Sequence, residues 1–195
     1  VEIGTAIVDS TGNWSFTPST DLAEGAHAIA ISQKDAAGNE SPKTTPVNFT
    51  VDSLPPTSTV EILGITDDSG VSTDFITNDN TLLFNGQVNG TLGADEKVQI
   101  SLDGGVTWND AISDANGTWT FDYTANPLMD GTYTVQAQIV DQAGNIGATA
   151  TQDIVIDTTI SVPAPAISMS NYDDAGVSST DFYSNDTQFT LNVIG

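Results

Sequence analysis

The chain repeats itself with a period of about 106 residues, and this repetition constrains its fold more than any other feature. Gly12–Phe16 matches Gly117–Phe121 at an offset of 105 residues (117 minus 12), and Asp35–Asn39 matches Asp141–Asn145 at an offset of 106 (141 minus 35). A period of this length fits one small domain per repeat. The phase predicts three parts: the C-terminal half of one repeat in residues 1–52, a complete repeat in 53–158, and the N-terminal third of the next in 159–195.

The complete repeat has the sequence pattern of an all-β fold. Short segments of alternating apolar and polar residues are separated by turns rich in Gly, Asp and Asn, and no segment has a helical period. Seven such segments in roughly 100 residues indicate an immunoglobulin-like Greek-key β-sandwich, repeated in tandem about every 105 residues. In the strand expected over 81–88, Leu82, Phe84 and Val88 face the core.

Two other strands of the complete repeat show the same alternation. The strand expected over 96–102 directs Leu102 inward and Ser101 outward, and the strand expected over 132–140 sends Gln138 to water. We therefore expect one apolar and one solvated face on each strand.

Turn residues and tryptophans add detail to this fold. Residues 103–105, Asp-Gly-Gly, predict a tight hairpin that needs positive φ, followed by a strand that carries Val106 and Trp108. Trp14 and Trp119 occupy equivalent positions (119 minus 14 is 105), so both are expected to fill the core of their sandwich.

The charge of the chain excludes several classes of partner. The net charge is -23, with Lys34, Lys43 and Lys97 as the only basic residues. Binding to nucleic acid or to an anionic membrane surface depends on basic side chains, so neither is expected. No apolar run approaches the roughly 20 residues of a membrane-spanning helix, and the absence of cysteine removes disulfide and thiol chemistry.

Acidic residues concentrate in one loop that occurs twice, at 67–81 and at 173–188. Its carboxylates repel one another, and no basic residue within the loop offsets them. Calcium (Ca2+) takes several oxygen ligands from carboxylates, amides and backbone carbonyls, so the loop is a candidate calcium site. The candidate ligands, including two acids expected at the same pole of the sandwich, are Asp67, Asp68, Asp74, Asn78, Asp79, Asp103 and Asp157, with Asp173, Asp174, Asp181 and Asp186 in the second copy.

An alternative remains open at this stage. Asp and Asn also form turns through local side chain–backbone hydrogen bonds, so the loop could be solvated and free of metal. The spacing of the acids is that of neither an EF-hand nor a calcium-binding nonapeptide repeat.

An enzyme is not expected. His27 is the only histidine and falls at the position of Tyr133 (133 minus 27 is 106), which favours packing over catalysis. Serine hydrolase chemistry needs a partnered histidine. No pair of carboxylates stands out from the many present, and nothing suggests a cleft.

The chain resembles the bacterial Ig-like repeats of giant surface adhesins. The segments that carry the resemblance are 103–108, 114–121, 128–135, 141–145 and 156–159, together with the acidic loop. The resemblance implies a non-enzymatic extender at the extracellular, bacterial cell surface, of the large type-I-secreted (RTX-type) kind, with calcium between domains. Its partners would be the neighbouring repeats of the same chain, while other domains contact a host or surface ligand. The alternative is a binding module that contacts a host glycan or protein through Trp108.

Overall fold

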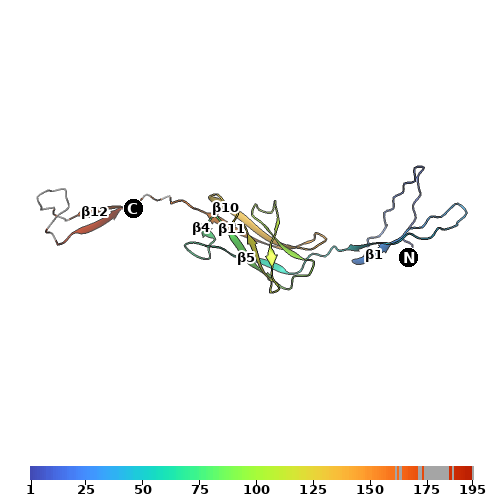
Figure 1. Ribbon diagram of the computed structural model, residues 1–195, viewed down its shortest axis with the longest axis horizontal. Helices are drawn as coiled ribbons and strands as arrows, with labels where there is room; N and C mark the ends of the chain where they lie inside the picture. The colour runs from blue at the N-terminus through green and yellow to red at the C-terminus, as the bar shows by residue number, and fades with distance from the viewer. Residues whose placement is uncertain (161, 163, 171–172, 174–184, 186, 195) are drawn as a thin grey trace. The chain divides into compact units, whose positions relative to one another are not determined.

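All elements of the computed structural model are β-strands, and the predicted all-β class is confirmed (Figure 1). The structure describes residues 1–160, 162, 164–170, 173, 185 and 187–194. None of these residues forms a helix with the length and apolar content that crossing a bilayer requires. The strands are β1 (Gly25–Ile29), β2 (Val47–Val51), β3 (Thr59–Ile65), β4 (Ile76–Thr77), β5 (Leu83–Asn89), β6 (Lys97–Ser101), β7 (Asn109–Asp110), β8 (Ile112–Ser113), β9 (Thr118–Asp122), β10 (Gly131–Val140), β11 (Ile146–Ile156), β12 (Ala166–Ser170) and β13 (Thr190–Ile194).

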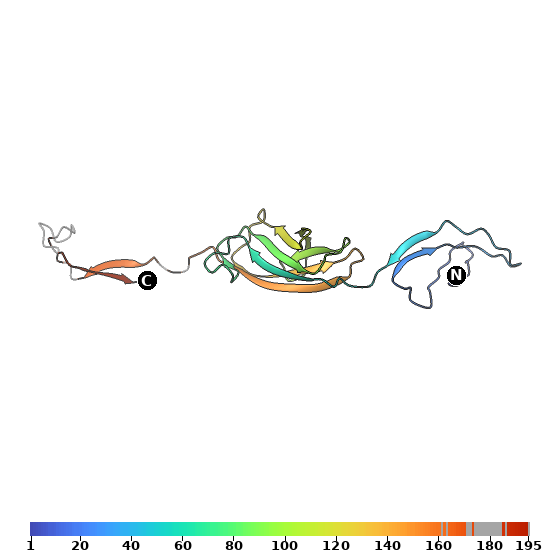
Figure 2. The ribbon, with the colours of Figure 1, turned by 90° about the horizontal axis from the view of Figure 1, so that it is seen from below.

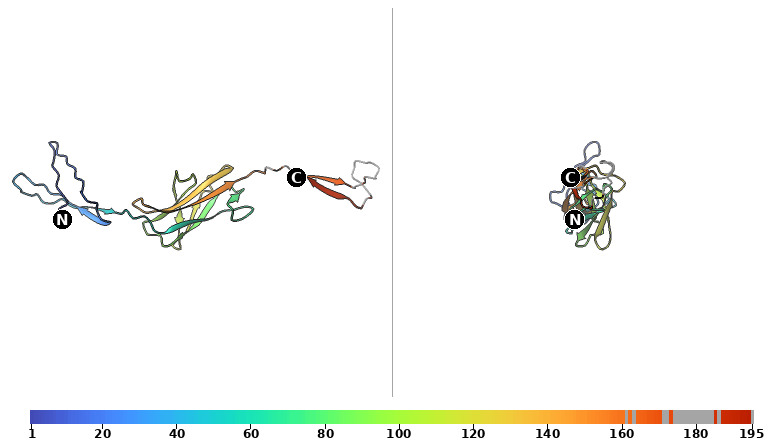
Figure 3. Two further views of the ribbon diagram at one scale, coloured as in Figure 1. Left: turned by 180° about the vertical axis from the view of Figure 1, so that it is seen from behind. Right: turned by 90° about the vertical axis from the view of Figure 1, so that its left-hand side faces the viewer.

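The strands from β3 to β11 form the two sheets of an immunoglobulin-like sandwich. One sheet has the order β4-β11-β10-β6-β7 and the other the order β3-β5-β9-β8. Neighbours in each sheet are often distant in sequence, as Greek-key connections require. Figure 3 shows β10 and β11 in one layer and β5 in the other. β11 also pairs in parallel with the short β4, which brings Ile156 opposite Thr77.

Two hairpins flank these sheets in the sequence. β1 pairs with β2 and β12 pairs with β13, both antiparallel. In Figure 2, β1 and β2 (blue and cyan) lie side by side, as do β12 and β13 (orange and red). Within the described residues, each of these hairpins is a two-stranded sheet.

Internal contacts divide the chain into two compact units. The first comprises residues 1–63, 85–121 and 134–152, and the second comprises 64–84, 122–133 and 153–195. Buried apolar residues of the first unit include Val60, Val88, Val98, Ile100, Trp119, Val135, Ala137, Ile139 and Val140. Those among the described residues of the second unit are Ile65, Leu82, Phe84, Ile154 and Ile156. The inward positions predicted for Leu82, Phe84 and Val88 are thus confirmed.

Trp119 is the largest fully buried side chain, and Gly86 makes room for it. A Cβ atom added to Gly86 would lie 2.3 Å from Cζ2 of Trp119 and 2.0 Å from the backbone oxygen of Glu61. The indole N–H donates to that same oxygen of Glu61 at 3.2 Å. The absence of a side chain in β5 therefore lets the indole lie across the strand and satisfy its buried donor in β3.

Two outward positions predicted from alternation are wrong. Ser101 is fully buried, because β6 ends there and the chain bends over residues 102–107. Its hydroxyl donates to Asp103 Oδ1 at 2.7 Å and accepts from the Gly105 N–H. Gln138 is buried too; it lies in β10, between β6 and β11, and its amide donates to Gln99 Oε1. Leu102, predicted inward, is only half-buried.

The segment after the 103–105 turn also differs from its prediction. Gly104 and Gly105 have φ of 72° and 92°, as predicted for the turn. Val106, however, lies outside any strand and is 80% exposed. The bend extends through residue 107, so pairing with β6 resumes only at β7.

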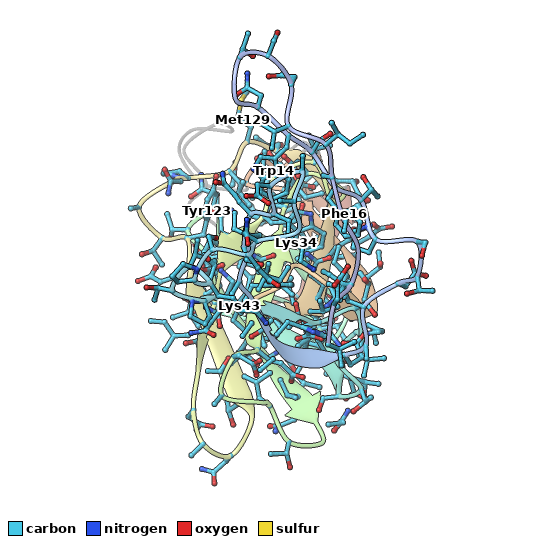
Figure 4. All side chains as sticks on the ribbon, turned by 90° about the vertical axis from the view of Figure 1, so that its right-hand side faces the viewer. Trp14, Phe16, Lys34, Lys43, Tyr123 and Met129 are labelled. Atoms are coloured by element: carbon cyan, nitrogen blue, oxygen red, sulfur yellow. The ribbon has the colours of Figure 1, made fainter. Side chains whose placement is uncertain are left out.

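The prediction of a core position holds for Trp119 and is wrong for Trp14. Trp14, labelled in Figure 4, is 48% exposed. The strands described within residues 1–52 are β1 and β2, and neither includes Trp14. Trp119 is covered by β3 and β5, and residues 1–52 contain no strands equivalent to these two. Trp14 is therefore left exposed.

Substitution of Gly86 tests the packing of Trp119. Gly86→Ala is expected to lower the free energy of unfolding by about 2–3 kcal/mol, because the new Cβ meets backbone that cannot move aside. Denaturant unfolding followed by tryptophan fluorescence measures the change. The control is Glu61→Ala, which shortens an exposed side chain on β3 and should change stability by no more than about 0.5 kcal/mol. Equal effects of the two substitutions would contradict this account of the core.

Candidate functional site

The acidic loop connects β3 to β5 and contains one buried carboxylate oxygen without a partner. Asp67 adopts a φ of 48°, and its backbone oxygen accepts a hydrogen bond from the Thr77 hydroxyl at 2.6 Å. This contact turns the chain so that Asp68 Oδ2 accepts from the Phe75 N–H at 3.3 Å. The other oxygen, Asp68 Oδ1, is buried and has no hydrogen-bond partner within the part of the chain that the structure describes. A buried carboxylate oxygen without a donor is costly unless a cation or water satisfies it.

The other acids of the loop accept hydrogen bonds from their own turns. Asp74 Oδ1 accepts from the Ile76 N–H at 3.0 Å. Asp79 Oδ1 accepts from the N–H and the hydroxyl of Thr81, at 2.8 and 2.7 Å. Asn78 donates its backbone N–H to the Ser69 hydroxyl. These contacts are the turn-forming interactions of the metal-free alternative.

Asp157 lies beside the loop, as predicted. The parallel pairing of β4 with β11 places its backbone N–H 2.9 Å from the Thr77 oxygen. Its carboxylate accepts from the N–H and hydroxyl of Thr159, each at 3.2 Å. The topology therefore brings one candidate ligand from a distant part of the sequence next to 67–79.

Both carboxylate oxygens of Asp103 accept hydrogen bonds from neighbouring residues. Oδ1 accepts from the Ser101 hydroxyl and the N–H groups of Val106 and Thr107, and Oδ2 accepts from the Thr107 hydroxyl at 2.7 Å. Hydrogen bonds from the Thr107 N–H, the Ser101 hydroxyl and the Thr107 hydroxyl lower the pKa of Asp103 from 3.8 to about 2. These donors favour the ionised form and give this carboxylate a structural role in the turn.

The described residues do not assemble a metal site from carboxylates alone. Among them, no group of three or more His, Cys, Asp or Glu side chains is arranged to hold an ion. An ion at this loop would therefore have Asp68 Oδ1 as its buried carboxylate ligand and would need amide, carbonyl or water oxygens in addition. Of the second copy, Asp173 is described, while Asp174, Asp181 and Asp186 lie outside the described residues.

A second use of aspartate, which sequence reasoning did not identify as one unit, is a five-residue turn. In the copy at 141–145, the Asp141 N–H donates to the Asn145 oxygen, and the Gly144 N–H donates to the Asp141 oxygen. The Asn145 N–H donates to Asp141 Oδ1 at 2.8 Å, and Gly144 has a φ of 91°. The same three hydrogen bonds and a positive-φ glycine at the fourth position occur at 9–13, 35–39, 114–118 and 141–145.

The pKa values of several turn aspartates follow from these contacts. A side-chain hydrogen bond from Thr11 lowers the pKa of Asp9, and those from Asn39 and Asn145 lower the pKa values of Asp35 and Asp141. These acids remain ionised because hydroxyl, amide and backbone donors surround them. The signal in the sequence was the pattern Asp-x-x-Gly-Asn/Thr, present twice in 1–52 and twice in 53–158.

The linker between the predicted repeats, residues 52–56, contacts residues on both sides of the predicted boundary. In the first predicted repeat, Glu24 accepts hydrogen bonds from the N–H and the hydroxyl of Ser53. The Asp52 oxygen accepts from the Asn145 side-chain amide at 3.1 Å. Further on, Pro56 is buried, and its backbone oxygen would lie 2.8 Å from a Cβ added to Gly147. Residues 52–56 thus lie against the turn and the first residues of β11.

The side chains considered for catalysis or ligand binding have structural contacts. The His27 ring stacks on Phe49 with centroids 5.4 Å apart, and Nε2 lies 2.7 Å from the Ala23 oxygen. Trp108 is half-buried, and its indole N–H donates to the Gly105 oxygen at 3.1 Å. Both residues pack against nearby chain.

The depressed pKa of Asp103 predicts a defined pH dependence. Its ionised form stabilises the fold above pH 3.8, and this contribution is lost as the pH falls toward 2, where the folded-state carboxylate is protonated. NMR titration of the carboxyl carbon should give a midpoint near 2. Asp103→Asn should flatten the dependence of stability on pH in that window. A midpoint close to 3.8 would show that the turn donors do not act on this group.

Known proteins place the chain in a family. A family model of the bacterial Ig-like domain matches residues 1–53 and 55–158. A crystal structure of a tetra-tandem repeat in the extending region of a large adhesion protein is similar at 21% identity with a TM-score of 0.36, over 84% of this chain and 39% of that chain. No curated protein matches the chain. The two successive matches of one model, in a chain folded as a β-sandwich with the predicted strand pattern, show that the chain belongs to the bacterial Ig-like domain family.

Proposed function

We propose that the chain is a structural extender segment of a bacterial cell-surface adhesin, located outside the cell and without enzymatic activity. The observation that supports this most directly is the head-to-tail repetition of one Ig-like unit, matched over 1–53 and again over 55–158. Serial domains that differ little in their loops lengthen a chain without adding a new site to each unit. We propose repeat boundaries at 1–52, 53–158 and 159–195.

The use of polar side chains supports the same proposal. Asp103 and Asp141 could serve as acids or ligands, but their carboxylates accept hydrogen bonds from donors in their own turns. His27 stacks on Phe49, and Trp108 is tied to its own loop. The polar and aromatic groups of these four residues therefore stabilise strands and turns.

We further propose that calcium stiffens the segment, with the acidic loop as the site. Residues 53–158 contain fifteen acidic residues and a single basic one, Lys97, so repulsion opposes close approach of successive repeats. Asp68 would supply the buried ligand, and the oxygens of Asp67, Asn78 or Asp79 could complete the shell. When bound, the ion would supply positive charge that offsets this repulsion. Asp103 is not required, because its oxygens already accept four hydrogen bonds.

The extender role predicts how length grows with repeat number. β11 has 11 residues, which at about 3.3 Å per residue spans roughly 36 Å. Inserting a second copy of residues 53–158 should therefore increase the maximum dimension, measured by small-angle X-ray scattering, by about 35–40 Å. An increase of less than half this value would mean that the repeats fold back on one another, and would contradict the extender role.

The calcium proposal predicts binding that depends on Asp68. Titration calorimetry of the chain with calcium should show heat above dilution, and calcium should raise the melting temperature relative to excess EDTA, because binding to the folded state stabilises it. Asp68→Ala should abolish both effects. The matched control, Asp103→Asn, removes an acid that is already satisfied and should leave them intact. Absence of both effects in the unsubstituted chain would end the proposal.

A further inference from the structure

A single peptide group joins the two predicted repeats. The peptide bond between Asp52 and Ser53 follows β2 directly and has two polar atoms, the Asp52 oxygen and the Ser53 N–H. The N–H donates to the carboxylate of Glu24, which lies next to β1, at 3.1 Å from Oε2. The oxygen accepts from the side-chain amide of Asn145, in the turn between β10 and β11, at 3.1 Å.

The geometry of a peptide makes these two contacts interdependent. The group is planar and trans, so its N–H and C=O point in opposite directions and cannot rotate separately. Turning the plane to release Asn145 also turns the N–H away from Glu24. The Ser53 hydroxyl adds a second contact to Glu24, which fixes the group further on that side.

One half of this arrangement occurs again at the end of the complete repeat. Asp130 is equivalent to Glu24 (130 minus 24 is 106), and Thr158 is equivalent to Ser53 (158 minus 53 is 105). Asp130 Oδ1 accepts from the Thr158 N–H at 3.1 Å and from its hydroxyl at 2.7 Å. In each repeat, an acid therefore accepts hydrogen bonds from a serine or threonine just after the final strand. Glu24 binds Ser53 after β2, and Asp130 binds Thr158 after β11.

We propose that this peptide group is a two-sided clamp that couples successive repeats without a metal ion. The preceding repeat holds the N–H through its acid, and the following repeat holds the carbonyl through the asparagine of its Asp-x-x-Gly-Asn turn. The surface beside Asp130 and Thr158 is then the docking point for the same turn of a following repeat. The inference rests on the proposed extender role but not on the calcium site.

Amide hydrogen exchange of Ser53, measured by NMR on the whole chain in excess EDTA, tests the clamp. Asn145→Ala should speed exchange about fivefold, the factor that corresponds to about 1 kcal/mol for one neutral hydrogen bond. Glu24→Ala should speed it at least tenfold, because the lost acceptor is charged. Asn145→Thr should behave like Asn145→Ala while keeping the turn, since the turn at 114–118 has threonine at this position.

The matched control is Asn39→Ala. Asn39 makes the same bonds to Asp35 as Asn145 makes to Asp141, but the side-chain amide of Asn39 donates to Asp35 and not to the Asp52–Ser53 peptide. It should leave Ser53 exchange unchanged. If Asn145→Ala and Asn145→Thr match this control while β10 and β11 stay protected, the clamp is overturned. That result would not affect the growth of length with repeat number, so failure of the clamp and failure of the extender role are distinguishable.

Discussion

Hydrogen bonds from backbone N–H groups to nearby aspartate carboxylates hold the turns on which the sheets depend. A chain with 26 acidic and three basic residues cannot neutralise its acids with ion pairs. Asp9, Asp35, Asp114 and Asp141 instead begin turns of one design and accept the N–H of the residue four positions later. Each turn satisfies backbone N–H donors within a reversal of the chain, and the turns at 35–39, 114–118 and 141–145 connect successive strands. Acidity and β-structure are therefore compatible in this sequence.

Packing in the core fixes the order of the strands, which the turns alone do not determine. Trp119 fills the interior only because Gly86 leaves space over β5 and because the Glu61 oxygen accepts the indole hydrogen. These residues come from β9, β5 and β3, so a single side chain fixes the lateral order of three strands in one sheet. Packing of this kind tolerates little change in volume.

The junction combines both types of interaction. An acid and an amide, each held by local structure, meet on one peptide group between β2 and β3. The proposed clamp would limit rotation of the linker, whereas a bound cation would reduce repulsion between acidic loops. Within the described part of the chain, Oδ1 of Asp68 is a buried carboxylate oxygen without a hydrogen-bond partner.

The sequence by itself determined the repeat, the all-β class and the inward faces of the central strands, because each depends on a local period. Leu82, Phe84 and Val88 alternate with polar neighbours, and that pattern needs no knowledge of the partner strands. The positive φ values in the 103–105 turn were determined in the same way, by two adjacent glycines. Tertiary structure decided which side chains are buried by strands that are distant in sequence. Ser101 and Gln138 are buried, and Trp14 is exposed, because of the strands that cover or fail to cover them. The candidate metal ligands were predicted from the charge density and recurrence of the acidic loop, and neither property specifies which carboxylates already have donors. Only the folded chain shows that Asp103 is satisfied, that Asp68 Oδ1 is not, and that Asn145 reaches the Asp52 carbonyl across 93 residues.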